Sequence, residues 1–278
     1  MPTFAERVHE KSPLLTRGDR TLLHELLENP VEAPLWRGED LARRAGAHPA
    51  AATRLAQRLG YDGYLQLREE LRAEHNRRLA GSADRFRSEQ RERGSQGPLS
   101  ALVDSEVRAL DMLVRHLDDD LLAEVADEIA GARRIFVFGR GNASVLAELM
   151  DRRLRRFGIT SVNLAGSGRD LAERILPLRE DDLVLAFAFR RAPRDLGPLL
   201  RHVGAVGARS VLVTDSLHTL DPAPTTVLAA ARGDLDGFAS LTVPMAISNA
   251  IVLALAQRHP RLTLPALDRL DDLLPVFD

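Results

Sequence analysis

The 278-residue chain contains no cysteine and only one lysine, Lys11. Without cysteine it cannot form disulfide bonds, use a thiol nucleophile or bind zinc through a cysteine cluster. The remaining strongly basic side chains are all arginines, which suit both phosphate and carboxylate ligands. The sequence lacks an apolar run of membrane-spanning length, and its first residues, MPTFAERVHEK, lack the hydrophobic segment of a secretory signal. We therefore expect a cytoplasmic protein with neither a cofactor nor a bound metal ion.

The chain does contain enough apolar sequence for two domains. Hydrophobic residues make up 45% of it and charged residues 28%, a balance typical of globular proteins with a buried core. Between residues 81 and 98 the sequence GSADRFRSEQRERGSQGP is polar, charged and interrupted by glycine, as is typical of a linker. We predict an N-terminal domain over residues 1–80, a linker over residues 81–98 and a second domain over residues 99–278.

The most informative stretch of the N-terminal domain runs from Arg37 to Tyr64. Its periodicity predicts two short helices, over residues 39–45 and 49–59, and Gly46 falls between them where the backbone needs a positive φ. This arrangement predicts a helix-turn-helix in an all-α domain. The apolar positions fall on one face of the two helices and predict a shared core: Leu41, Ala45, Ala52, Leu55, Ala56 and Leu59.

The opposite edge of the second predicted helix is polar and suits a DNA major groove. Arginine pairs with guanine, glutamine with adenine, and threonine contacts a thymine methyl group or a phosphate. By spacing alone, an ordinary helical hairpin with a solvated charged face explains the pattern equally well. On the DNA-binding interpretation, in which the flanking arginines neutralise phosphates, the surface comprises Arg37, Arg43, Arg44, His48, Ala50, Thr53, Arg54, Gln57 and Arg58.

The second predicted domain begins with two amphipathic helices between residues 99 and 132 and then alternates strands with helices. Alternation of this kind predicts an α/β domain with a parallel sheet covered on both faces. Helices are predicted over residues 145–157, around residues 199–203, and over residues 243–256 and 267–274. The predicted strands are short apolar runs: Ile135–Phe138, Ser161–Leu164, Leu183–Phe189, Ser210–Thr214 and Thr226–Ala230.

Ligands of such sheets gather where the carboxyl ends of strands meet helix N-termini, because free backbone N–H groups and the helix dipole attract anions there. Three loops fall at this edge, over residues 139–144, 190–194 and 214–216. The GxG in the first loop is also explained by a tight turn without a ligand. As binding residues for a small anionic effector, these loops offer Gly139, Arg140, Gly141, Asn142, Ser144, Arg190, Arg191, Asp215 and Ser216.

The two halves together resemble one family. The segment LARRAGAHPAAATRLAQRLGYDGYLQLREEL resembles the N-terminal DNA-binding domain of the MurR/RpiR transcriptional regulators, with LGYDGY as its most specific part. The segments RRIFVFGRGNASVLAELMDRRLRRFG, SVLVTDS and FASLTVPMAISNAIVLAL are similar to the sugar isomerase (SIS) domain of those regulators. The resemblance implies a helix-turn-helix domain joined to an α/β SIS domain with a five-stranded parallel sheet flanked by helices.

The same resemblance implies a function and partners. It implies a ligand-responsive regulator, more often a repressor, that binds a double-stranded DNA operator and a small anionic effector such as a sugar phosphate or sugar acid. It also implies a homodimer or homotetramer held together by the SIS domains. An effector changes DNA affinity only to the extent that it binds two arrangements of the protein unequally.

The chain departs from the family pattern at two places. Before the recognition helix it has His48-Pro49-Ala50-Ala51 in place of a serine and a threonine, so a capping hydroxyl is lost. His48 is interpreted as a surface residue near phosphates or as a pH switch. After the third strand, residues 186–194 contain no hydroxyl, whereas the family commonly has a serine-rich phosphate loop. Arg190 and Arg191 can hold an anion by charge, or can instead pair with Asp195, Asp215 or a neighbouring subunit.

Two rival functions remain. A sugar-phosphate isomerase of SIS type needs a carboxylate or histidine that moves a proton between adjacent carbons. Glu148, Glu173, His202 and His218 are available, but none lies in a motif, so we assign no catalytic residue. The other rival is a SIS domain that serves only for oligomerisation, which follows if both anion loops are empty.

Overall fold

The computed structural model describes residues 4–11, 14–29, 32–79, 97–215, 220, 222–233 and 239–277. The chain divides into two compact units, residues 1–92 (unit 1) and 93–278 (unit 2). The predicted linker lies outside the described residues except for Gly97 and Pro98. Within the described ranges, none of the helices combines the length and apolar character that a bilayer crossing requires.

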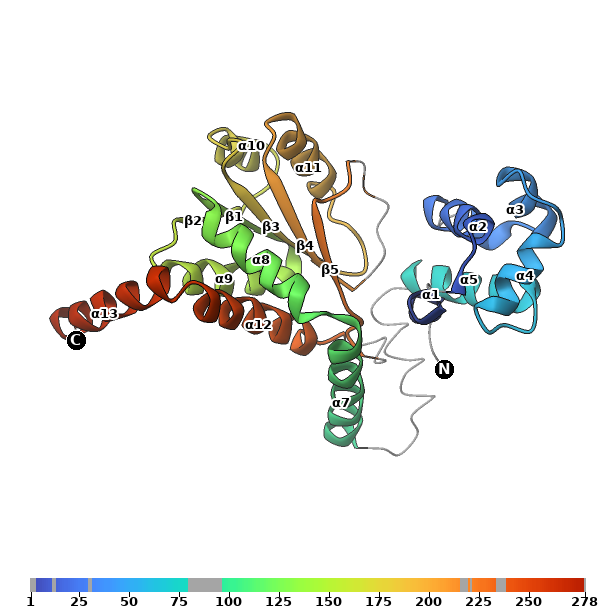
Figure 1. Ribbon diagram of the computed structural model, residues 1–278, viewed down its shortest axis with the longest axis horizontal. Helices are drawn as coiled ribbons and strands as arrows, with labels where there is room; N and C mark the ends of the chain where they lie inside the picture. The colour runs from blue at the N-terminus through green and yellow to red at the C-terminus, as the bar shows by residue number, and fades with distance from the viewer. Residues whose placement is uncertain are drawn as a thin grey trace. The chain divides into compact units, whose positions relative to one another are not determined.

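Unit 1 is built from helices alone in its described part (Figure 1). Helix α2 begins with a capping box, in which the Thr16 hydroxyl accepts from the Asp19 backbone N–H at 3.3 Å. In return, the Asp19 carboxylate accepts from the Thr16 backbone N–H at 2.8 Å. The elements are α1 (Phe4–Lys11), α2 (Arg17–Glu28), the 3₁₀ helix η2 (Ala33–Leu35), α3 (Gly38–Arg44), α4 (Ala51–Arg58) and α5 (Tyr64–Leu79).

The LGYDGY segment closes the core of unit 1. Leu59, Tyr61 and Tyr64 are all buried in one apolar cluster. Gly60 has a φ of +82°, a conformation that favours glycine. Burial raises the pKa of the Tyr64 hydroxyl to about 12. The aromatic-rich spacing of this segment is therefore explained by packing.

Unit 2 is a three-layer α/β domain with five parallel strands in the order β2-β1-β3-β4-β5. The predicted fold class is confirmed, and each predicted strand agrees with the structure to within one residue at either end. The strands are β1 (Ile135–Gly139), β2 (Ser161–Asn163), β3 (Leu183–Ala188), β4 (Arg209–Thr214) and β5 (Thr226–Ala229). The helices are α7 (Pro98–His116), α8 (Asp119–Gly131), η3 (Gly141–Ala143), α9 (Ser144–Arg156), α10 (Arg169–Ile175), α11 (Leu196–Ala205), α12 (Thr242–Arg258) and α13 (Pro260–Phe277).

Alternate residues of the strands fill two separate cores. Ile135 and Val137 of β1 point to the face that is covered by α8, α9 and α12. Phe136 and Phe138 point to the other face, which α10 and α11 cover (Figure 1). Strands β1 and β3 are buried along their whole length because both faces are covered. The sheet thus leaves its two ends, where strands begin and where they stop, as the places for polar loops.

An ion cluster ties β1 to β3 at the end of the sheet where these strands begin. The fully buried carboxylate of Asp182 accepts from Arg133 at 2.8 Å and from Arg134 at 3.0 and 3.2 Å. Burial on its own raises the pKa of Asp182. Hydrogen bonds from Arg134 and from the Arg179 backbone N–H, with the nearby positive charges, outweigh burial and hold the pKa below its usual value.

We expect this carboxylate to make unit 2 sensitive to acid. Because its folded pKa lies below the unfolded value of about 3.9, the stabilisation is complete above that pH and is lost as the pH falls through the folded pKa. Wild type should therefore lose stability below about pH 5 more steeply than Asp182→Asn, which is less stable at pH 7. Denaturant unfolding followed by circular dichroism at pH 7, 5 and 3 measures how the free energy of unfolding changes with pH in wild type and in the variant. Parallel slopes would contradict the assignment.

Candidate functional site

Helix α4 of unit 1 has one buried edge and one exposed edge. Ala52, Leu55 and Ala56 are completely buried in the core of unit 1. The turn before α4 has the predicted geometry, because Gly46 adopts a φ of +61°. Helix α3 begins one residue earlier and α4 two residues later than predicted. The opposite edge of α4 is exposed at every predicted position: Ala50, Thr53, Arg54 and Gln57.

The turn before α4 is held by the His48 ring, where the capping hydroxyl of the family is missing. Ala50 provides no side-chain cap. Instead, the backbone N–H of Ala50 donates to Nδ1 of His48 at 3.2 Å, and the N–H of Ala51 donates to the His48 carbonyl at 2.8 Å. Two N–H groups at the beginning of the helix are therefore satisfied. The side-chain cap is absent, as the sequence suggested, and His48 has a structural role in the turn before the helix.

Arg54 and Arg58 lie about one helical turn apart on α4 but have different surroundings. Arg58 donates to the buried carboxylate of Asp19 and, at 3.3 Å, to the hydroxyl of Thr16. Burial alone raises the pKa of Asp19, but the bonds from Thr16 and Arg58 lower it overall. Arg58 therefore holds α4 against α2. Arg54 forms no ion pair within the part of the chain that the structure describes, so its guanidinium remains available to a partner.

The other predicted phosphate contacts belong to α3 and its start. Arg43 forms an ion pair with Asp40 and remains exposed. Arg44 lies over the ring of Trp36, with its guanidinium carbon 4.2 Å from the ring centroid. Arg37 precedes the helix, and its backbone N–H donates to the Asp40 carboxylate at 3.0 Å. These contacts order the arginines while leaving their heads at the surface, which suits phosphate contacts better than base contacts.

In unit 2, the loop after β1 makes a very close turn. A Cβ atom on Gly139 would lie 2.4 Å from the carbonyl oxygen of Ala143, so only glycine fits. Gly141 has a φ of +56°, and the hydroxyl of Ser144 donates to its carbonyl at 2.7 Å. Asn142 and Ser144 are both exposed. The tight-turn interpretation of this GxG is therefore satisfied, and the turn also leaves polar groups at the surface.

Arg140 joins three loops. Its Nε donates to Asp195 at 3.1 Å, and its Nη1 donates to the carbonyls of Leu164 at 2.7 Å and Gly139 at 3.2 Å. Its guanidinium carbon lies 4.3 Å from the ring centroid of Phe138. Sequence analysis placed Arg140 among the effector ligands. The structure commits most of its donors to fixing the ends of β1 and β2 and the start of α11.

A second arginine, which sequence analysis missed, organises the other loops. The carboxylate of Asp215, after β4, accepts from Nε of Arg232 at 2.6 Å and from the backbone N–H of Arg190 at 2.6 Å. Arg232 also donates to the Ser240 carbonyl at 3.4 Å, before α12, and lies over the ring of Phe189 at 4.8 Å. Both members of the pair are largely buried, with side chains 7% and 10% exposed. This pair holds Arg190 at its positive φ of 61°.

The three predicted loops meet at one edge of the sheet. Strand pairing places Gly139 opposite Phe187 and Ala188 opposite Thr214, so β1, β3 and β4 stop side by side. The contacts of Arg140 with the loop after β3, and of Asp215 with Arg190, join the loops directly. Ser216, the last predicted effector residue, lies outside the described residues.

The described residues considered for isomerase chemistry are divided between the two faces of the sheet. Glu148 is exposed on α9, on one face of the sheet. Glu173 lies on α10, on the other face, and pairs with Arg169 at 2.9 Å. His202 on α11 contacts a backbone carbonyl through Nε2 at 3.3 Å. His218 lies outside the described residues. Glu148 therefore lies across the sheet from Glu173 and His202.

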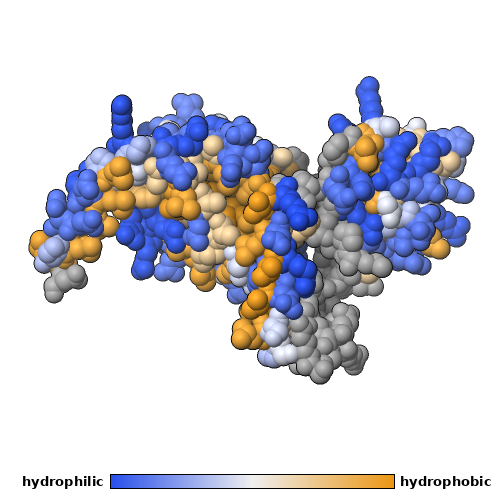
Figure 2. All heavy atoms as spheres, turned by 60° about the horizontal axis from the view of Figure 1, so that its bottom comes forward, coloured by the Kyte–Doolittle hydropathy of each residue, from blue (hydrophilic) through white to orange (hydrophobic). Residues whose placement is uncertain are grey.

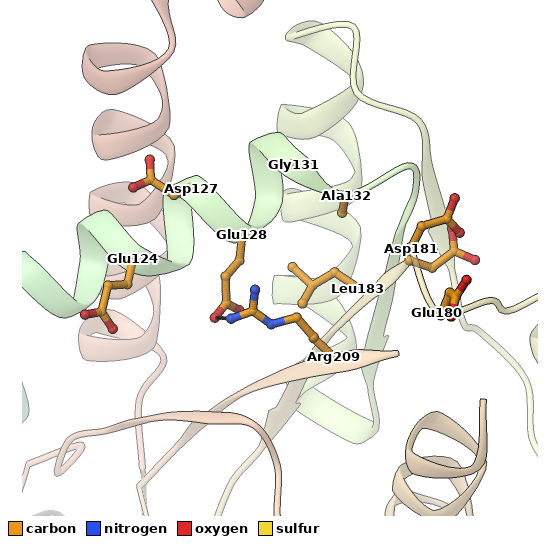
Figure 3. A pocket seen from close by; sticks show the side chains of 10 residues that line it. Glu124, Asp127, Glu128, Gly131, Ala132, Glu180, Asp181, Leu183 and Arg209 are labelled. Carbon is orange, nitrogen blue, oxygen red and sulfur yellow. Dashed lines mark hydrogen bonds and ion pairs between the residues drawn. The ribbon is translucent and has the colours of Figure 1, made fainter. Parts of the chain in front are cut away.

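A pocket of about 440 Å³ lies at the opposite end of the sheet, where β3 and β4 begin (Figure 3). Glu128 and Arg209 pair inside it, and burial raises the pKa of Glu128. Among the described residues, no group of three carboxylates or histidines is arranged to hold a metal ion. Carboxylates dominate the lining, which disfavours an anion in this pocket. The lining residues are Glu124, Asp127, Glu128, Gly131, Ala132, Glu180, Asp181, Asp182, Leu183 and Arg209.

Comparison with known families and relatives agrees with this architecture. Residues 128–254 match the SIS domain, so unit 2 contains a SIS domain. The chain is 19% identical over 201 residues to an uncharacterized HTH-type transcriptional regulator of Clostridium perfringens, with 72% of this chain and 71% of the relative covered. It is 26% identical over 215 residues to the bifunctional protein glk of Paraburkholderia xenovorans, covering 76% of this chain but only 32% of that protein. The chain thus spans about a third of the latter.

Two solved structures share the fold. The sugar isomerase domain of an RpiR transcription factor from Sphaerobacter thermophilus superposes with a TM-score of 0.59 at 24% identity, covering 64% of this chain and all of that one. The NanR protein of Vibrio vulnificus, complexed with ManNAc-6P, superposes with a TM-score of 0.56 at 19% identity over 98% of both chains. The resemblance to helix-turn-helix regulators with a SIS domain is confirmed.

Proposed function

We propose that this chain is a DNA-binding transcriptional repressor that responds to a small anionic metabolite through its SIS domain. The observation that carries the proposal is the division of α4 into a fully buried apolar edge and an exposed edge bearing Thr53, Arg54 and Gln57. These side chains suit direct contacts with bases, and the same chain contains a SIS domain. The names of the curated HTH-type relatives support the same conclusion.

The effector site is proposed at the carboxyl ends of β1, β3 and β4. The exposed side-chain amide of Asn142 supplies a neutral donor, while Arg190 and Arg191 supply charge. NanR of V. vulnificus was solved with a sugar phosphate, ManNAc-6P, which supports this class of ligand. The loop after β3 lacks hydroxyl groups. We therefore propose sugar phosphates, sugar acids and similar small anions as the class.

Regulation requires that the effector distinguish two arrangements of the protein. We propose that paired SIS domains of a dimer or tetramer hold the DNA-reading units at a fixed spacing, so that two α4 helices meet two half-sites. Effector binding at the strand ends then favours one spacing over another, and its effect on DNA affinity cannot exceed the difference between its affinities for the two spacings. In this proposal the chain catalyses no reaction. The separation of Glu148 from Glu173 and His202 supports that view.

One experiment tests function and effector together. Sugar phosphates, sugar acids and inorganic phosphate are screened for thermal stabilisation of the purified full chain, since a ligand at a hundred times its Kd adds about 2.7 kcal/mol to the folded state. The chain is then used to capture genomic DNA fragments with and without the stabilising compound. We expect a few fragments to be enriched and the compound to change their capture. Turnover of the compound would favour an isomerase, and capture of random fragments alone would refute the regulator.

A double variant tests the arginine loop. Replacing Arg190 by glycine and Arg191 by alanine is expected to abolish stabilisation by the effector while leaving DNA capture intact, because both charges are lost. Glycine is used at residue 190 because it adopts the observed φ of +61° without strain. The matched control, Arg201→Ala, removes an exposed arginine of α11 and should respond as wild type does. An unchanged response in the double variant would place the effector elsewhere.

A further inference from the structure

Among the described residues, helix α13 packs on unit 2 through its first half. Thr263 and Ala266 are buried, and Leu267 packs against the core that includes α9 and α12. The contact is close, because a Cβ atom on Gly158, just after α9, would lie 3.2 Å from Cβ of Ala266. Beyond Leu267 every residue of α13 is exposed except the half-buried Leu270. Figure 1 shows the end of α13 running out past the sheet.

The outer turns of α13, residues 270–277, carry an apolar surface. Leu273, Leu274, Val276 and Phe277 are 54%, 47%, 75% and 84% exposed. Residues 270, 273, 274 and 277 continue the spacing of residues 263, 266 and 267, so one apolar stripe runs from the buried half into solvent. Figure 2 shows hydrophobic atoms gathered along this end of the helix. A short helical end in water is marginal, and Pro275 removes one backbone donor, so a packing partner would stabilise it.

The charges beside this stripe favour a particular partner. The outer half carries Asp271 and Asp272, which form no ion pair with any described residue. The end of α9, which α13 contacts through its buried half, exposes Arg152 and Arg156, and these also lack an ion pair within the described ranges. One copy therefore offers an acidic apolar helix end and, at the base of the same helix, a surface rich in arginine. The acidic helix end and the arginine surface carry opposite charges but lie at opposite ends of α13.

We infer that two copies of this chain exchange the outer turns of α13, each docking on the α9 and α13 surface of the other. A two-fold interface requires one surface that contains both complementary parts, and this surface contains them. The exchange makes the contact twice, buries both apolar stripes and places Asp271 and Asp272 near the partner arginines. This pairing surface rests on the proposed function, in which two subunits pair through their SIS domains. Self-association is measured without DNA or effector, so the pairing surface and the proposed function can fail independently.

Disrupting the apolar stripe is the first test. In sedimentation equilibrium, the full chain of 30.6 kDa should associate, and Leu273→Asp/Leu274→Asp/Phe277→Asp should raise the Kd of one association step at least tenfold. These side chains are exposed, so circular dichroism should be unchanged. The control Leu176→Asp changes another exposed leucine, 79% exposed, just after α10 and should associate as wild type does. A triple variant with the wild-type Kd, or a wild type that stays monomeric, would overturn the inference.

Charge reversal tests whether the contact is made between copies. Arg152→Asp/Arg156→Asp in one protein, and Asp271→Arg/Asp272→Arg in another, should each weaken self-association several-fold, because like charges then face each other. In an equimolar mixture, both contacts of the mixed dimer again join opposite charges, so association should return close to the wild-type Kd. If the mixture remains as weak as the separate variants, the helix end packs within its own chain or on a different protein, and the exchange is refuted.

Discussion

Replacing Arg232 by methionine is expected to lower the free energy of unfolding of unit 2 by about 3–5 kcal/mol, the usual cost of breaking a buried ion pair. The variant removes the guanidinium that pairs with the largely buried carboxylate of Asp215 at 2.6 Å. It also releases the contact with the Phe189 ring and the bonds before α12. We expect the loop at Arg190 to lose its fixed conformation as well, because Asp215 holds that backbone N–H.

The single tryptophan of the chain makes this effect measurable by unit. Trp36 is buried in the core of unit 1, so its fluorescence follows unit 1, while circular dichroism follows both units. In denaturant, Arg232→Met should move the transition of unit 2 and leave the Trp36 transition unchanged. The matched control is Arg174→Met, which breaks an exposed pair with Asp170 on α10. That loss should be at most about 1 kcal/mol.

A double variant separates the pair from the individual side chains. Asp215→Asn/Arg232→Met removes both charges, so it should be more stable than Arg232→Met alone, since the buried carboxylate is neutralised together with its arginine. Two results would show that the pair does not fix the strand-end loops. One is that Arg232→Met lowers the free energy of unfolding no more than the exposed control does. The other is that the losses of the single variants Asp215→Asn and Arg232→Met add up to the loss of the double variant.

The sequence predicted the sheet well because of how a parallel sheet is built. Strands that are covered on both faces appear as continuous apolar runs, and β1 and β3 were recognised for that reason. Helix α10 was not predicted, since its seven residues contain few apolar positions and follow Gly168 at a φ of +56°. The start of α13 was not predicted: the expected segment covered residues 267–274, whereas the helix runs from Pro260 to Phe277, and Pro265 disfavours a helix in the part that was missed.

The candidate sites were predicted in position but less well in role. Spacing along a helix was enough to place Thr53, Arg54 and Gln57 on one exposed edge. It could not show that Arg58 reaches Asp19, 39 positions earlier in the chain. The same limit applies to Arg140, whose partner Asp195 is 55 positions away. Contacts between loops depend on how the whole chain packs, which the periodicity of a single segment does not record.

Arg54 is expected to carry most of the sequence preference in DNA binding. It lies on the exposed edge of α4 between Thr53 and Gln57 and makes no ion pair with another described residue. A guanidinium in this position can form two hydrogen bonds to one guanine, a contact worth about 1–3 kcal/mol of discrimination. Arg54→Ala should therefore weaken binding to a captured fragment roughly ten- to hundredfold, while binding to random duplex changes little.

Three variants distinguish the possible roles of the exposed edge of α4. DNA binding of each variant is measured by titrating a captured fragment and a random duplex at one salt concentration. Arg54→Lys keeps the charge but not the paired donors, so it should lose specificity as alanine does if Arg54 reads a base, and retain binding if it contacts a phosphate. Arg58→Ala should lower the stability of unit 1, followed by Trp36 fluorescence, because Asp19 then loses its partner. Arg201→Ala, in unit 2, should leave both binding curves unchanged. If wild type and Arg54→Ala bind the captured fragment with equal affinity, Arg54 does not contact a base.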